Sequence, residues 1–188
     1  ADTLLVATET DLLRFSLTDG RAEPLTPLEA DNTVTRSNDG RADPQGGFWI
    51  GTMGKNAKEG AGSLYRYWRG ELRPLRDGIT IPNATSFAPG GRTAYFADTA
   101  AHIVWRIPLD ADGWPEAAWE VFLDHRDSGI NPDGAVVDAA GHLVVAEWGG
   151  SRVARYAPTG DLVEEITLPV PQPTCPAFGG SDLSTLYV

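Results

Sequence analysis

Three short segments of the chain carry amide and carboxylate side chains among glycine, proline and serine. They are Arg36-Ser37-Asn38-Asp39-Gly40, Pro82-Asn83-Ala84-Thr85 and Asn131-Pro132-Asp133-Gly134. Converging oxygen ligands, with few nitrogens and no thiolates, suit a hard divalent cation such as Ca²⁺, Mg²⁺ or Mn²⁺. The alternative interpretation is that Asn-Asp-Gly and Pro-Asp-Gly are turn tripeptides that bind nothing. On these residues alone, both interpretations stay open.

The elements around the three segments repeat along the chain. Each segment is followed by a polar turn and then by an apolar run, and these runs are centred near Trp49, Tyr95 and Val144. The repeat is therefore about 46 residues long, and each repeat holds several strands, which is the signature of a β-propeller. The turns are Asp43–Gly46, Ala88–Gly91 and Asp138–Gly141, and we expect them to be purely structural.

Short apolar stretches bounded by Gly, Pro, Asp and Asn predict an all-β protein. The predicted strands cover Leu4–Thr8, Asp11–Ser16, Gly47–Gly51, Ser63–Tyr67, Thr93–Asp98, His102–Ile107, His142–Glu147, Arg152–Tyr156 and Leu186–Val188. About four repeats fit in the chain. They form either a complete four-bladed ring or four blades of a larger one, and the strand-like sequences at both ends favour the larger ring. In a propeller the first strand of each blade lines the central channel, so the three polar segments would converge on one axis.

Composition excludes several classes of protein. The chain has 188 residues, of which 41% are hydrophobic, so it is not a disordered chain. Its 15 Lys and Arg residues against 26 Asp and Glu give a net charge of −11, which argues against nucleic acid as a partner. No apolar run is long enough for a transmembrane helix, and no protein partner is inferred. The single cysteine, Cys175, excludes an intrachain disulfide and predicts a cytoplasmic protein.

Read in order, these segments resemble the senescence marker protein/gluconolactonase family, also called regucalcin-like. The resemblance rests on Arg36–Asp43, Phe48–Met53, Gly62–Tyr65, Ile81–Asn83, Tyr95–Asp98, Pro132–Gly134, Ala146–Gly150 and the stretch from Leu168 to Gly180. It implies a six-bladed propeller that hydrolyses sugar lactones with one divalent metal ion, Ca, Zn or Mn. Residues 1–188 would then be a single propeller domain of about four blades that lacks blade segments at both ends.

The resemblance also implies roles for individual residues. Asn83 and Asp133 correspond to metal ligands of the family, and Asp133 would in addition orient or deprotonate the attacking water. Arg36 and Asn38 correspond to residues that contact the substrate. A third ligand of the family, a glutamate, belongs to an N-terminal blade that this chain does not contain. Ala84 follows Asn83 where the family has glycine, which raises the question of whether the local turn is displaced.

Two other functions compete with lactone hydrolysis. The first is a non-catalytic calcium-binding or regulatory propeller, because an oxygen-lined metal site alone does not prove turnover. The second is a propeller that serves only as a scaffold for protein partners, for which the channel would be dispensable.

Overall fold

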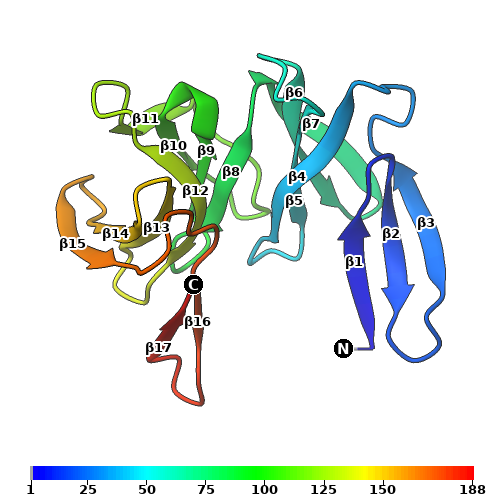
Figure 1. The fold of residues 1–188 in the computed structure, drawn as a ribbon. Coiled ribbons are helices and arrows are strands. Elements are labelled where there is room, and N and C mark those ends of the chain that lie inside the picture. The colour runs from blue at the N-terminus through cyan, green and yellow to red at the C-terminus, as the bar shows by residue number, and fades with distance from the viewer. Residues whose placement is uncertain (1) are drawn as a thin grey trace.

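A computed structural model describes residues 2–188, which form five antiparallel β-sheets (Figure 1). Three of these sheets have four strands, one has three and one has two. The helical element in the described part of the chain is a short 3₁₀ turn, η1 (Thr99–Ala101). No helix within residues 2–188 is long and apolar enough to cross a membrane.

The sheets follow one another in chain order. The first comprises β1 (Thr3–Ala7), β2 (Asp11–Ser16) and β3 (Ala22–Pro27), and the second β4 (Thr35–Ala42), β5 (Phe48–Gly54), β6 (Gly62–Trp68) and β7 (Glu71–Ile79). The third comprises β8 (Pro82–Phe87), β9 (Thr93–Asp98), β10 (Ile103–Pro108) and β11 (Glu120–Asp124). The fourth comprises β12 (Asn131–Val137), β13 (Leu143–Trp148), β14 (Arg152–Tyr156) and β15 (Leu162–Thr167), and the last β16 (Ala177–Gly179) and β17 (Thr185–Tyr187).

Each four-stranded sheet is a meander in which consecutive strands pair, and the sheets stand side by side like blades (Figure 1). The first strands lie toward the middle of this arrangement, where β8 contacts β4 on one side and β12 on the other. The all-β prediction and the predicted strands are confirmed. The outer strands β3, β7, β11 and β15 and the short strand β16 were not located from the sequence.

The core consists of apolar layers between successive sheets. Trp49 and Leu64 of the second sheet pack with Phe96 of the third, and Tyr95 of the third sheet packs with Val145 of the fourth. Alternate residues of one strand therefore enter two different layers. Both faces of the middle strands are covered, which explains why β9 and β13 are continuous apolar runs rather than alternating ones.

The turns before β5 and β13 have a structural role, as expected. The Asp43 carboxylate accepts hydrogen bonds from the backbone N–H groups of Gln45 and Gly47 at 3.0 and 2.7 Å and from Trp49 Nε1 at 3.1 Å. Asp138 occupies the same place before β13 and accepts from the backbone of His142 at 2.9 Å. Each aspartate closes its turn, so neither is available for chemistry.

Candidate functional site

The first strands of the three four-stranded sheets are each interrupted by a β-bulge at the same place. The register shifts lie between Ser37 and Gly40 in β4, between Asn83 and Ser86 in β8, and between Pro132 and Ala135 in β12. At each shift two residues of the first strand oppose one residue of the second, which redirects the side chains there. Asn38 and Asp133 are the first bulged residues of their strands, and Asn83 comes directly before the bulge of β8.

Ala84 adopts the conformation that glycine would take. Its φ is 55°, in the left-handed region, and its side chain is buried. A residue with a Cβ atom pays about 1–2 kcal/mol for this conformation. The alanine therefore strains the bulge of β8 but keeps the backbone conformation that a glycine would take there.

A chain of hydrogen bonds fixes the orientation of the Asn83 amide. Asn83 Nδ2 donates to Thr99 Oγ1 at 2.8 Å, and Thr99 Oγ1 donates to the carbonyl of Pro132 at 2.7 Å. Because its nitrogen is engaged by Thr99 of η1, Asn83 presents its oxygen Oδ1 to the other side. There the nearest donor is Asn38 Nδ2, at 3.4 Å.

Arg36 and Asn38 of β4 are held against each other and against β8. Asn38 Nδ2 donates to the carbonyl of Pro82 at 2.9 Å, and Asn38 Oδ1 accepts from Arg36 Nη1 at 3.0 Å. Arg36 Nη1 also donates to the carbonyl of Ser37 at 2.9 Å. These contacts of the guanidinium all go to neutral oxygens, so its positive charge stays available for a ligand.

Asp133 is a partly buried carboxyl group with another carboxylate nearby. Burial raises the pKa of Asp133 to about 6, and the negative charge of Asp39 adds to this rise, while the N–H of Gly134 opposes it. A group placed in this way gains from a bound cation, which would offset both the burial and the repulsion.

The four side chains meet in one cavity of about 350 Å³. Its walls are Arg36, Asn38, Met53, Ile81, Asn83, Thr99, Ala100, Asn131, Asp133 and Trp148. The structure thus brings together every site residue that the sequence predicted.

Met53, Thr99 and Trp148 were not predicted as site residues, and Asn131 was recognised only as part of its polar segment. In an antiparallel pair the end of the second strand lies beside the start of the first, and Arg36 pairs with Met53 and Asn131 with Trp148 in this way. Met53 and Trp148 could therefore have been predicted from the sequence. Each lies at or near the end of the apolar run that forms the second strand of its sheet, and this end lies beside the polar segment of the first strand. Trp148 is the aromatic wall of the cavity and remains 42% exposed.

The donor atoms of the cavity fit a hard cation in type. Asn83 supplies an oriented amide oxygen and Asp133 a carboxylate, whereas the described cavity walls include no thiolate or imidazole, and their one sulfur is the Met53 thioether. Within residues 2–188, no group of three or more His, Cys, Asp and Glu side chains could hold a metal ion. Asp133 is the one carboxylate among the described walls of the cavity, and the assignment of Asn83 and Asp133 as metal ligands stays a prediction.

The chain is similar to one protein family over its whole length. The family described as the SMP-30/Gluconolactonase/LRE-like region matches residues 1–188. A 6-deoxy-6-sulfogluconolactonase of Pseudomonas putida is 41% identical over 155 residues, which are 82% of this chain and 53% of that protein. A pentonolactonase of Haloferax volcanii is 36% identical over 158 residues, 84% of this chain and 54% of that protein. The chain thus spans about half the length of these relatives.

Solved structures agree with these matches. The crystal structure of a calcium-binding protein, regucalcin, from Agrobacterium tumefaciens is 41% identical, with a TM-score of 0.95, over 98% of this chain and 63% of that one. This likeness relates the five sheets of the described chain to the fold of that larger protein.

Proposed function

Because the chain belongs to the SMP-30/gluconolactonase/LRE-like family, we propose that it forms part of a metal-dependent sugar lactone hydrolase. The observation that carries this proposal is the single cavity that gathers Arg36, Asn38, Asn83 and Asp133 at one end of three neighbouring first strands. Relatives named as lactonases act on sugar lactones, and a cavity of about 350 Å³ has room for one such ring.

In the proposed reaction, water adds to the lactone carbonyl carbon and the ring C–O bond breaks, so that the ring oxygen gains a proton and an aldonic acid is released. Asn83 and Asp133 would hold a divalent metal ion, which would polarise the carbonyl and stabilise the developing negative charge. Asp133 would orient the attacking water and take its proton, which requires an approach of about 3 Å. Arg36 and Asn38 would hold the sugar hydroxyl groups in place.

We also propose that the chain is part of one six-bladed propeller domain. Three complete four-stranded sheets, flanked by a three-stranded and a two-stranded sheet, support this arrangement, as does the greater length of the similar regucalcin chain. The ion, Ca, Zn or Mn, and the cytoplasmic location stay predictions.

The proposal is tested by following acid release in a pH-stat. The full-length protein is stripped of metal and offered aldonolactones with added Ca²⁺, Mn²⁺ or Zn²⁺. We expect acid release that depends on the metal. If metal binds but no lactone is opened, the protein is instead a calcium-binding or regulatory propeller, a function that the name of the similar regucalcin structure favours as the second candidate.

Arg36→Ala should raise KM for a lactone about tenfold or more and leave metal affinity nearly unchanged. A guanidinium has no acceptor atom and cannot ligate a cation, whereas its hydrogen bonds to substrate oxygens are charge-assisted. Steady-state kinetics and calorimetric metal titration measure the two effects separately. Arg14→Ala is the control, because Arg14 pairs with Glu23 on the surface of the first sheet. A parallel loss of metal affinity in Arg36→Ala would contradict the assigned role.

Trp148→Ala should raise KM by about tenfold for a sugar lactone, with a smaller change in kcat. The indole forms an aromatic wall of the cavity, against which the apolar face of a sugar ring would pack. Trp148→Phe retains an aromatic face and should lose less than Trp148→Ala. An equal rise in KM in the two variants would show that the ring face is not the feature that matters.

A further inference from the structure

Asp39 and Arg41 of β4 make contacts that hold β8 although the two strands belong to different sheets. Asp39 Oδ2 accepts a hydrogen bond from the backbone N–H of Thr85 at 2.9 Å, and Arg41 Nε donates to the carbonyl of Thr85 at 2.8 Å. Both backbone groups of one residue of β8 are thus paired with side chains from β4. These side chains replace the hydrogen bonds that a neighbouring strand would give.

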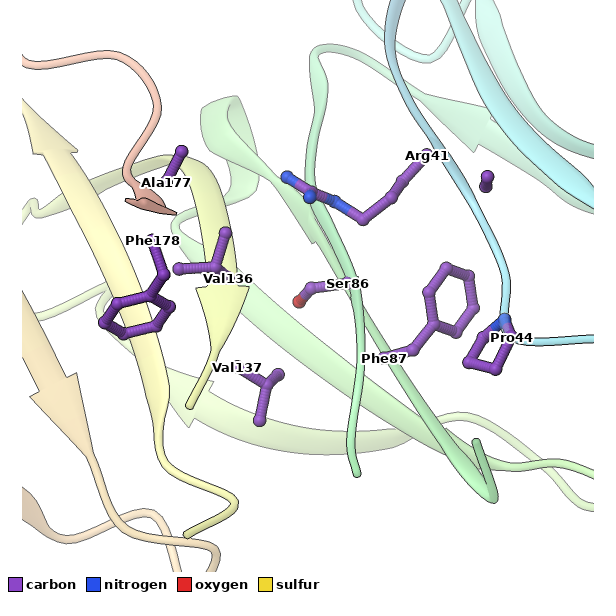
Figure 2. Close-up of a pocket in the computed structure, with 9 residues that line it drawn as sticks. Arg41, Pro44, Ser86, Phe87, Val136, Val137, Ala177 and Phe178 are labelled. Atoms are coloured by element: carbon purple, nitrogen blue, oxygen red, sulfur yellow. The ribbon is translucent and has the colours of Figure 1, made fainter. Parts of the chain in front are cut away.

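Arg41 extends this connection to a third sheet. Its Nη2 donates to the carbonyl of Ala135 in β12 at 3.0 Å. Figure 2 shows the Arg41 side chain reaching from β4 across β8 toward β12, above Ser86. One guanidinium therefore joins the first strands of three sheets, and its planar fork suits two carbonyl oxygens at fixed positions.

The two anchor points lie close to the candidate metal ligands. Thr85 and Ala135 each come two residues after a candidate ligand, Asn83 in β8 and Asp133 in β12. Thr85 is within the bulge of β8, and Ala135 is the first paired residue after the bulge of β12. The ladder is broken at these places, so a second set of hydrogen bonds is needed to fix the backbone.

We propose that Asp39 and Arg41 are positioning residues, which set the separation of Asn83 and Asp133 by fixing Thr85 and Ala135 across three sheets. This inference rests on the proposed function and adds two residues to it. Neither side chain lines the candidate cavity. Their effect is expected through the backbone, and partners that orient metal ligands in this way are worth about 10–100-fold in metal affinity or activity.

The test measures metal affinity by calorimetry, kcat and KM for a lactone, and Tm, all on the full-length protein. Asp39→Ala and Arg41→Met should lower metal affinity and kcat by about 10–100-fold. Asp39→Asn retains an oxygen that accepts the Thr85 N–H bond, so it should stay within about threefold of wild type. Arg41→Lys can reach one carbonyl and should fall between wild type and Arg41→Met.

A general loss of stability is separated from positioning by a matched variant. Arg155→Met removes an arginine that pairs with Asp138 inside the fourth sheet, away from the candidate cavity. It should lower Tm without changing metal affinity at 25 °C. If it lowers metal affinity as much as Arg41→Met does, the effect is global and the inference is wrong.

The remaining outcomes are equally distinct. If Asp39→Asn loses as much as Asp39→Ala, Asp39 acts through its charge and the positioning role is overturned. If wild type binds metal and opens lactones while Asp39→Ala and Arg41→Met match it within threefold, this inference alone fails. If wild type neither binds a divalent metal nor opens a lactone, the proposed function fails and the inference fails with it.

Discussion

Asp133→Asn is expected to lower kcat for lactone hydrolysis at least about 100-fold while the fold persists. The change removes the candidate base and the charged metal ligand together, and loss of an acid–base group alone usually costs 10²–10⁴-fold. The Asn side chain keeps the size of Asp, so the walls of the cavity should not move. Rates are measured at saturating metal, so that weakened metal binding and lost base catalysis can be told apart.

The same substitution should not lower Tm when metal is absent. Burial raises the pKa of Asp133 to about 6, above its ordinary value of 3.8. At pH 7, above both values, the carboxylate is ionised, and its ionised form disfavours the folded state. A neutral Asn removes this penalty, so Tm in chelator should stay level or rise slightly.

Asp161→Asn is the matched control for Asp133→Asn. It removes one negative charge from the turn before β15, where Asp161 accepts a hydrogen bond from Thr159 in an exposed position. Its kcat should equal that of wild type. Activity of Asp133→Asn within about tenfold of wild type would remove Asp133 from the reaction.

The sequence predicted the residues of the candidate site better than it predicted their contacts. The three polar segments could be identified because they recur at the same stage of the repeat, and the family resemblance then pointed to Arg36, Asn38, Asn83 and Asp133 within them. Their convergence depends on β-bulges, which redirect the side chains and which the sequence did not predict. The hydrogen bonds from Asn83 through Thr99 to Pro132 join two sheets, so no residue spacing along the chain predicts them.

The sequence predicted best the strands that are buried on both faces of their sheet. β9 and β13 lie between two core layers and stand out as apolar runs, whereas every residue of β15 is exposed and two glutamates interrupt its apolar residues. Asp43 is a second example of a feature that the sequence predicted only in part. Its turn was recognised, but its partner Arg66 lies on β6, and a buried arginine cannot be distinguished from a surface one by its neighbours in sequence.

Asp43→Ala is expected to destabilise the protein by about 3–5 kcal/mol. Asp43 Oδ2 accepts from Arg66 Nε at 2.6 Å, and both side chains are 0% exposed. Arg66 also donates to the carbonyl of Asp112 at 2.7 Å and lies over the ring of Trp114. Without Asp43 a buried guanidinium keeps its charge and loses its counterion, which costs far more than the hydrogen bond alone. Differential scanning calorimetry should show Tm lowered by about 10 °C.

The repeat supplies matched controls for this prediction. The fourth sheet has the same pair, Asp138 with Arg155, but their side chains are 13% and 32% exposed, so water can solvate the arginine that Asp138→Ala leaves behind. Asp138→Ala should therefore lower Tm less than Asp43→Ala does. The third sheet has Ala88 in place of the aspartate, and Tyr95 pairs with Arg106 just as Trp49 pairs with Arg66. Arg106 is 39% exposed and pairs with Glu120 instead, so an arginine without the aspartate is accepted in this fold where water reaches it. The double variant Asp43→Ala with Arg66→Met should recover much of the lost stability, as is common when both members of a buried ion pair are replaced. If the double variant is less stable than Asp43→Ala, packing of the arginine stem rather than its unpaired charge dominates the loss.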